Sequence, residues 1–283
     1  MKKGRKRVIT LYVVLRVLVV AVMAFAFVQK DYDHVFLCIL TLLLFMIPSI
    51  IDKKLNIKLP TVLECIIILF VFAAEILGEI QEFYLRFPYW DTILHTLNGF
   101  IMAAIGFAMI DILNQNPKLY FNMSPVFAAF VAFCFSMTIG VLWEFFEFGM
   151  DTLTFTDMQK DSYVTTVATV DLNPDKVNVP IVIKDISKTV IGGKVNGTEQ
   201  SIVIDGGYLD LGLRDTMFDL IVNCIGAICF SFLGVLYIMG RSHFAKSFIP
   251  QMKTPSEIEE TRKEIEEMKN KYRKKNRKGK KNE

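Results

Sequence analysis

The stretch 125–150 reads PVFAAFVAFCFSMTIGVLWEFFEFGM, and its composition decides the class of fold. Its first 19 residues carry no charged side chain. About 20 apolar residues in an α-helix are enough to cross the ~30 Å hydrocarbon layer of a membrane. Near the end of the stretch stand two carboxylates, Glu144 and Glu147, where a membrane span is ordinarily apolar. The stretch therefore predicts a transmembrane helix that carries charge at membrane depth.

Five further apolar runs of similar length occur along the chain, at 8–28, 34–51, 61–80, 91–113 and 215–239. The chain has 283 residues, of which 53% are hydrophobic, and its mean hydropathy is +0.40. This apolar excess excludes an ordinary soluble enzyme and a disordered protein. All five cysteines lie inside the apolar runs, which excludes a disulfide-rich secreted module. We expect an all-α polytopic membrane protein with six transmembrane helices.

Lysine and arginine predict the orientation of these helices, because short loops rich in both stay in the cytoplasm. With the N-terminus inside, the cytoplasmic pieces hold 23 of these residues and the external pieces hold eight. We therefore expect both termini in the cytoplasm. The first apolar run is long and is interrupted by Arg16, which disfavours its removal as a signal peptide.

The polar part of the chain divides into two regions. Between the fifth and sixth runs lies 151–213, which we expect to fold outside the cell as a small β-rich insert. Its β-branched runs are separated by Asn, Asp, Gly and Pro, as is typical of short strands, and they span 163–170, 177–184, 189–191 and 201–204. The expected organisation is helices one to five in 1–150, the insert in 151–213, helix six in 214–240 and a basic helical cytoplasmic tail in 241–283.

The tail contains Thr254-Pro255-Ser256-Glu257, which has the residue types of a capping box at the start of a helix. Apolar side chains at 258, 265 and 272 recur every seven residues. This short repeat predicts a weak self-association through the tail helix, and a solvated helix is the alternative interpretation. The last residues, 273–283, are strongly basic and are expected to lie against anionic lipid. Neither an aromatic pattern nor a motif indicates nucleic-acid binding.

Ionisable residues at membrane depth are costly, so they mark candidate functional sites. In the last three runs such residues and one asparagine are spaced by three or four, which places those of each run on one helix face. They are Asp91, His95, Glu144, Glu147, Asp215, Asp219 and Asn223. The expected orientation brings all of them to the outer part of the membrane. Small residues continue the same faces through Gly99, Gly140 and Ala227, so we expect the fourth, fifth and sixth helices to pack together.

Structural interpretations stand beside the functional one. Asp91, Asp151 and Asp215 flank helix ends, where carboxylates act as caps or interfacial groups. Asn223 suits a hydrogen bond between helices. Four side chains lie deeper: His95, Glu144, Glu147 and Asp219. They form either a buried structural network, in which each polar group is paired with another member, or the core of a functional site.

Three motifs carry a resemblance to known membrane proteins: DTILHTLNG at 91–99, WEFFE at 143–147 and DTMFDLIVNCIG at 215–226. Together they resemble the YjdF-like bacterial membrane proteins over residues 8–240. More distantly, the last three helices are similar to VanZ-like proteins, which show an Asp-x-x-x-His element, a Glu-bearing helix and a final Asp-x-x-x-Asn-x-x-Gly helix. The resemblance implies a multi-pass protein of a bacterial plasma membrane, and VanZ-like members are linked to glycopeptide-antibiotic tolerance. The large insert departs from the compact VanZ-like pattern.

Three classes of function fit these residues. Carboxylates with one histidine and no thiolate suit a hard divalent ion such as Mg²⁺ or Mn²⁺. An enzyme would then be a metal-assisted hydrolase or transferase acting on membrane lipid head groups or lipid-linked wall precursors. Its candidate catalytic residues are His95, Glu144, Glu147 and Asp219, its metal ligands would add Asp91 and Asp215, and Asn223 would give polar support. A non-enzymatic membrane scaffold and a proton-coupled transporter are the alternatives, so the sequence leaves open whether the protein is an enzyme.

Overall fold

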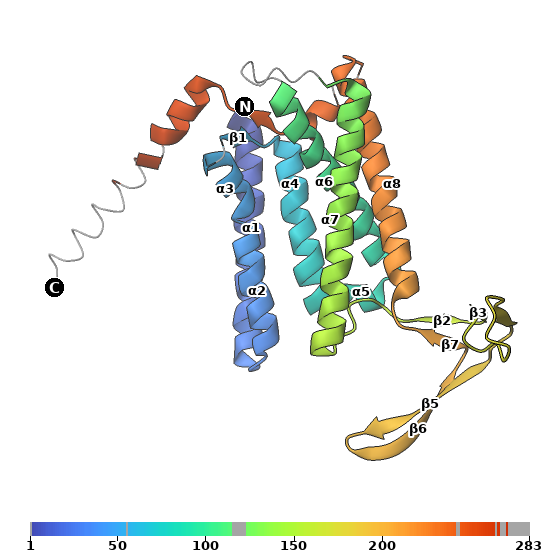
Figure 1. Cartoon of the computed structure of the whole chain (residues 1–283). Coiled ribbons are helices and arrows are strands. Elements are labelled where there is room, and N and C mark those ends of the chain that lie inside the picture. The colour runs from blue at the N-terminus through green and yellow to red at the C-terminus, as the bar shows by residue number, and fades with distance from the viewer. Residues whose placement is uncertain are drawn as a thin grey trace. The chain divides into compact units, whose positions relative to one another are not determined.

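The structure is a computed structural model, and it describes residues 2–54, 56–114, 123–241, 244–263, 265–266 and 270. Six helices of the described residues are long and apolar enough to cross a membrane: Arg7–Val28, Tyr32–Lys54, Thr61–Ile80, Trp90–Asn114, Pro125–Thr154 and Leu213–Ile238 (Figure 1). Their bounds agree with the predicted spans to within a few residues, which confirms the six-helix membrane fold. The chain divides into two compact units, Met1–Met137 with Asn223–Glu283, and Thr138–Val222.

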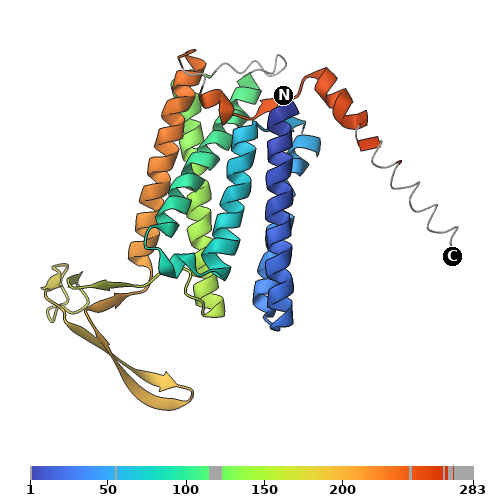
Figure 2. The ribbon, with the colours of Figure 1, turned by 180° about the vertical axis from the view of Figure 1, so that it is seen from behind.

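The first three spans form one part of the larger unit. α1 (Lys2–Val28) packs against α2 (Tyr32–Leu44), and the third span, α4 (Thr61–Val71) with its continuation η1 (Phe72–Ile80), contacts both (Figure 2). Their shared core is apolar and includes Val19, Cys38, Phe45, Ile68 and Ile76. Cys38 is therefore a small buried hydrophobic side chain, as its place in an apolar run predicts.

Two of these spans are not uniform α-helices. The second span breaks between α2 and α3 (Ile47–Lys54), where Pro48 lies in the first turn and so removes no helical hydrogen bond. The third span widens into the π-helix η1, after which the Gln81 N–H donates to the Ile76 carbonyl. The sequence does not predict this widening, because a short apolar run carries no signal for the type of helix.

The last three spans supply the other core of the larger unit. After the short α5 (Phe83–Arg86), this core joins α6 (Trp90–Asn114) to the first part of α7 (Pro125–Thr154) and the second part of α8 (Leu213–Ile238). It is built mainly of small and aromatic side chains, including Ala103, Ala104, Phe107, Ala128, Ala132, Ala227 and Phe230. Both α7 and α8 continue as unbroken helices into the smaller unit.

Two glycines bring the backbones of α6 and α8 into contact. A Cβ on Gly99 would lie 2.0 Å from the carbonyl oxygen of Asn223, and a Cβ on Gly226 would lie 2.0 Å from that of Thr96. Only hydrogen fits at either position. Ser136 of α7 joins the same crossing, because its hydroxyl donates to the Gly99 carbonyl at 2.8 Å. The predicted packing of these three helices through small residues is confirmed in the larger unit.

After α8 the chain folds back onto this core. The 3₁₀ turn η2 (Ala245–Ser247) leads to Phe248 and Ile249, which are both buried. The Phe248 ring lies 5.2 Å from the ring of Phe100 on α6 in an edge-to-face contact. β8 (Gln251–Met252) then pairs antiparallel with β1 (Ile57–Lys58), which precedes α4.

The helix of the tail begins as predicted. The Thr254 N–H donates to the Glu257 carboxylate at 3.0 Å, and the Glu257 N–H donates to the Thr254 hydroxyl at 3.4 Å, so the capping box is present. The bonds from Lys58 and from the Thr254 N–H lower the pKa of Glu257 to about 2. The heptad position 272 and the basic residues 273–283 lie outside the described residues, so self-association and lipid contact stay predictions.

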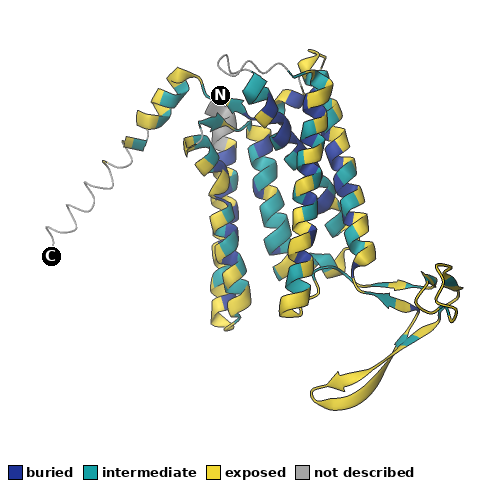
Figure 3. Ribbon diagram, in the orientation of Figure 1, coloured by how far each residue is buried: buried dark blue, intermediate teal, exposed yellow. Residues whose placement is uncertain are grey.

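The smaller unit carries the β-rich insert between the ends of α7 and α8. Its strands pair two by two and antiparallel: β2 (Ser162–Val164) with β7 (Tyr208–Asp210), β3 (Val167–Thr169) with β4 (Ile181–Ile183), and β5 (Lys188–Val195) with β6 (Thr198–Asp205). The insert between later helices is thus confirmed. The β5–β6 hairpin is exposed along most of its length (Figure 3).

The strands of the insert differ in their bounds from the β-branched runs of the sequence. The run 163–170 is two strands rather than one, and in the run 177–184 only 181–183 is a strand. The hairpin extends well beyond the β-branched runs 189–191 and 201–204, because backbone pairing carries it through glycines and polar residues. Its turn, Asn196-Gly197, has positive φ at both residues, and this is the conformation that a two-residue hairpin requires.

Protease added to intact spheroplasts tests the predicted orientation. We expect cleavage within 151–213, first at the exposed Asn196-Gly197 turn, while the residues after 240 are protected by the membrane. Immunoblots with tags at the C-terminus and inside the insert would follow both segments. Cleavage of the tail with the insert left intact would reverse the orientation.

Candidate functional site

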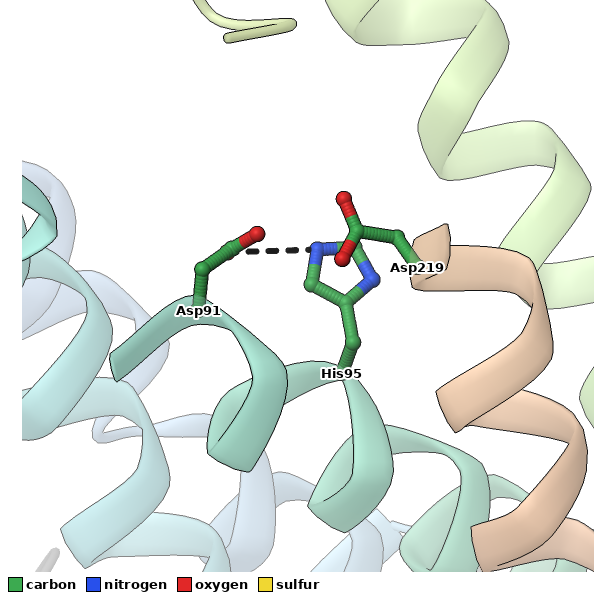
Figure 4. A group of neighbouring side chains, drawn as sticks. All are labelled: Asp91, His95 and Asp219. Atoms are coloured by element: carbon green, nitrogen blue, oxygen red, sulfur yellow. Dashed lines mark ion pairs between the residues drawn. The ribbon is translucent and has the colours of Figure 1, made fainter. Parts of the chain in front are cut away.

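The first two turns of α6 carry the histidine of the site. His95 follows Asp91 by one helical turn, and its Nε2 lies 3.5 Å from Oδ1 of Asp91 (Figure 4). The imidazole is buried, with His95 only 7% exposed, whereas Asp91 is partly exposed. Asp91 also lies in the first turn of α6, where the helix dipole favours a negative charge. The pair therefore combines a helix-end interaction with two potential metal ligands.

A polar layer lies one turn further along α6. Asn98 donates from Nδ2 to Oδ1 of Asn223 at 3.1 Å, and Asn223 is fully buried. The Nδ2 of Asn223 also reaches the carbonyl of Ser136 at 3.5 Å. These bonds and the Ser136–Gly99 bond tie the three helices together at one level. The prediction that Asn223 makes a hydrogen bond between helices is confirmed.

On α7 the two glutamates are the buried members of an otherwise exposed segment. Glu144 is 4% exposed and Glu147 is 8% exposed. Their neighbour Trp143 donates from Nε1 to Oε1 of Glu147 at 2.9 Å, one helical turn away. Because both glutamates are buried on a helix that is apolar elsewhere, their ionised forms require opposite charge or hydrogen-bond donors nearby.

Asp219 is the corresponding residue of α8. It lies one turn from Asn223 and is 2% exposed, so it is buried as deeply as the glutamates. Figure 4 draws its carboxylate together with Asp91 and His95. Buried histidine and carboxylates on spans α6, α7 and α8 agree with the sequence interpretation that these helices turn their polar faces away from lipid.

Asp151 and Asp215 bind a loop of the insert. The Asp151 carboxylate accepts hydrogen bonds from the Thr156 hydroxyl and from the N–H groups of Met158 and Gln159, at 2.6–2.8 Å. Asp215 accepts from the Lys160 N–H at 2.7 Å. The segment 155–161 between α7 and β2 is called the strap here. Both aspartates lie at helix ends and anchor the strap there, which favours the structural interpretation for both.

The last residue of this strap is an aspartate, Asp161. Burial raises the pKa of Asp161, and the negative charges of Asp157, Asp210 and Asp151 raise it further, while Lys160 lowers it. Folding of the insert therefore favours the protonated form of Asp161. The contribution of Asp161 to the stability of the insert is lost as the pH rises through its raised pKa.

Two polar residues of the site were not predicted from the sequence. From the sequence, Trp143 is interpreted as an aromatic residue of the membrane interface or as a packing residue. It lies four residues before Glu147, however, and this spacing permits a hydrogen bond between side chains along one helix face. Asn98 lies three residues after His95, and its contact is with Asn223, 125 positions away in the chain. The spacing in the sequence could have indicated the bond of Trp143 with Glu147. The contact of Asn98 with Asn223 could not be predicted, because it depends on how α6 and α8 cross.

Comparison with known proteins agrees with this architecture. Residues 10–240 match the model of a family described as "Predicted membrane protein (DUF2238)". The chain belongs to this family. It is also 26% identical over 106 residues to an uncharacterized protein of Thermotoga maritima, a match that covers 38% of this chain and 53% of that protein. The chain thus spans about half the length of this relative. No solved structure matches the chain.

These matches confirm the predicted membership of a family of bacterial membrane proteins and the multi-pass localisation. The similarity to VanZ-like proteins stays a prediction. The three polar motifs lie inside the segment that matches the family, since 91–99, 143–147 and 215–226 all fall within 10–240. The β-rich insert lies within that segment as well.

Proposed function

We propose that this DUF2238 protein is a metal-assisted hydrolase or transferase whose divalent ion is held by His95 and buried carboxylates. The substrates we propose are lipid head groups or lipid-linked wall precursors at the membrane face where α6 begins. The metal we propose is Mg²⁺ or Mn²⁺, because the donors are oxygen-rich and include no thiolate. The chain is an integral membrane protein in either case.

One observation carries the proposal. Among the described residues, two groups have the ligand types and spacing for a metal ion: Asp91 with His95 and Asp219, and His95 with Glu144 and Glu147. In each group one ligand atom per residue lies within 4.8 Å of the others. Four of these side chains are also at least nine-tenths buried. Several ionised carboxylates buried together repel one another, and a divalent cation relieves that repulsion.

Helix geometry supports the same grouping. In the larger unit, Gly99, Ser136 and Asn223 fix which faces of α6, α7 and α8 meet. Two residues that are one turn apart lie on the same face of a helix. His95 is therefore on the same face of α6 as Gly99, one turn closer to Trp90. Asp219 is likewise on the same face of α8 as Asn223, one turn earlier in the chain. Glu144 lies two turns beyond Ser136 on the unbroken helix α7. The close crossing therefore supports a convergence of these side chains.

The buried groups suit phosphoryl or related group-transfer chemistry. A bound divalent ion supplies a Lewis acid that polarises a phosphoryl oxygen or lowers the pKa of a bound water. His95, paired with Asp91, has the position of a ligand or of a proton acceptor oriented by a carboxylate. Carboxylates that are not ligands would take or deliver a proton at the reacting oxygen.

The core beyond the polar layer disfavours a proton-coupled transporter. Such a carrier needs titratable or polar groups along a route across the membrane. Among the described residues, the buried polar residues of α6, α7 and α8 lie in the layer of Ser136 and Asn223 or on its Trp90 side, and the Ser231 hydroxyl of α8 is a buried polar atom on the other side. The hydrophobic core on that side consists of apolar residues such as Ala104, Phe107 and Phe230. A site reached from one membrane face fits an enzyme better.

A deletion strain tests the proposal when its membrane lipids and wall precursors are profiled by mass spectrometry. We expect one phosphate-bearing lipid or precursor to accumulate, and we expect the wild-type gene to restore the normal profile. Asp219→Asn and Glu144→Gln should fail to restore it while reaching the membrane in normal amounts. Restoration by both variants would overturn the proposed activity, because a metal-assisted reaction cannot survive loss of its ligands.

A further inference from the structure

The end of α7 that carries the glutamates has an aromatic surface. Trp143 is 44% exposed, Phe145 66%, Phe146 50% and Phe148 61%, whereas Glu144 and Glu147 between them are buried. The segment belongs to a candidate membrane span, so side chains exposed there face lipid. Less than two turns of helix thus carry a lipid-facing aromatic surface and two buried carboxylates side by side.

Trp143 connects these two environments. A tryptophan of the membrane interface ordinarily gives its indole N–H to water or to lipid head groups. Here the N–H points inward and donates to Oε1 of Glu147 at 2.9 Å, and the ring lies 5.3 Å from the ring of Phe146. The indole therefore has one face toward lipid while its polar atom holds a carboxylate of the candidate site.

We infer that Trp143 is a positioning residue for Glu147 and forms the lipid-side wall of the site, so that the substrate enters sideways from the bilayer. The substrate class is then an amphiphile with an anionic phosphate head group, whose acyl or prenyl chains stay in lipid against the aromatic surface. This inference rests on the proposed function, because it assigns the substrate class and the entry side of that same site.

Trp143 acts on the site through two physical effects. A hydrogen bond from a neutral donor to a carboxylate fixes the orientation of that carboxylate, and loss of such an outer partner typically weakens metal binding about 10- to 100-fold. In addition, a wall that is itself apolar and in contact with lipid admits hydrocarbon chains, whereas a water-soluble substrate would gain nothing from it. Both effects depend on the side chain of Trp143.

Metal binding tests the positioning role in purified full-length protein. Binding of Mn²⁺ is measured by the loss of the EPR signal of the free ion in a neutral detergent. Trp143→Phe keeps an aromatic ring and removes the N–H, and it is expected to weaken Mn²⁺ binding about tenfold. The matched control is Trp90→Phe, since Trp90 is the other tryptophan of the chain and packs against Phe83. The control is expected to bind Mn²⁺ like the wild type.

Fluorescence tests the entry side. In the Trp90→Phe protein, Trp143 is the sole tryptophan, and nanodiscs of phosphatidylcholine receive a small fraction of lipid with brominated chains, which quench a nearby indole. We expect Mg²⁺ to increase quenching by brominated phosphatidic acid and to leave quenching by brominated phosphatidylcholine unchanged. Adding Glu147→Gln should abolish the Mg²⁺-dependent part.

The outcomes separate the two proposals. Equal Mn²⁺ binding by Trp143→Phe and wild type overturns the positioning role. Mn²⁺ binding with no difference between the two brominated lipids overturns lateral entry of an anionic lipid and leaves the metal site intact. Absence of Mn²⁺ binding by the wild-type protein overturns the proposed function and this inference together.

Discussion

Gly99→Ala is expected to be among the most destabilising single substitutions in the chain. The added Cβ would lie 2.0 Å from the Asn223 carbonyl oxygen, which is backbone and cannot move aside as a flexible side chain would. Overpacking a core ordinarily costs about 1–3 kcal/mol. Because two helix backbones must separate here, we expect a loss of about 3 kcal/mol, with Gly226→Ala giving a loss of similar size against Thr96.

Equilibrium unfolding in mixed micelles with increasing SDS, followed by circular dichroism, measures this loss. Gly149→Ala is the matched control, because Gly149 also lies in a membrane-spanning helix and nothing is within 4 Å of its Cβ position. Alanine is the better helix former, so the control is expected to stabilise the protein by about 0.5–1 kcal/mol. Equal stability of Gly99→Ala and Gly149→Ala would show that α6 and α8 do not cross as described.

The spans could be predicted from the sequence, but not their internal irregularities. Runs of apolar residues near 20 in length have one stable form in lipid, since every backbone polar group must be satisfied within the helix. The capping box at Thr254 and Glu257 and the small residue Gly99 gave equally direct signals. The π-helix η1 and the short strand β7 gave none, because neither has a composition of its own.

The candidate site could be predicted as a set of residues but not as a set of contacts. Helical spacing identified His95 and Glu144 as members of polar faces, and their burial agrees with that interpretation. The same spacing included Asp215, whose carboxylate accepts from the Lys160 N–H in the strap. That bond depends on the path of a loop, and a loop path has no periodicity to read. The role of Trp143 was hidden for a related reason, since a tryptophan near a membrane surface has an ordinary explanation.

Removing one carboxylate from the cluster is the second change with a large expected effect. If the buried groups hold a divalent ion, the metal-free wild type carries uncompensated like charges, and Glu144→Gln or Asp219→Asn relieves part of that repulsion. The metal-free variants should then melt at the same temperature as the metal-free wild type or above it. The wild type alone should gain stability from the ion, by about 2.7 kcal/mol when the free ion is at a hundred times its Kd.

A self-satisfied structural network predicts the opposite behaviour. In such a network each buried charge is already paired, and removal of one partner leaves the other without compensation. Breaking a buried pair in this way costs about 3–5 kcal/mol. The two accounts therefore differ in the sign of the effect of one amide substitution, and they also differ in whether the ion matters at all.

Thermal melting in detergent of wild type, Glu144→Gln and Asp219→Asn, each with EDTA and each with added Mg²⁺ or Mn²⁺, tests the metal site most directly. Glu199→Gln in the exposed β5–β6 hairpin is the control for loss of a carboxylate elsewhere, and it should melt like the wild type under every condition. The metal-site account predicts stabilisation by the ion in the wild type and in this control, and its loss in both cluster variants. Melting that is insensitive to metal, with both cluster variants strongly destabilised, would contradict it.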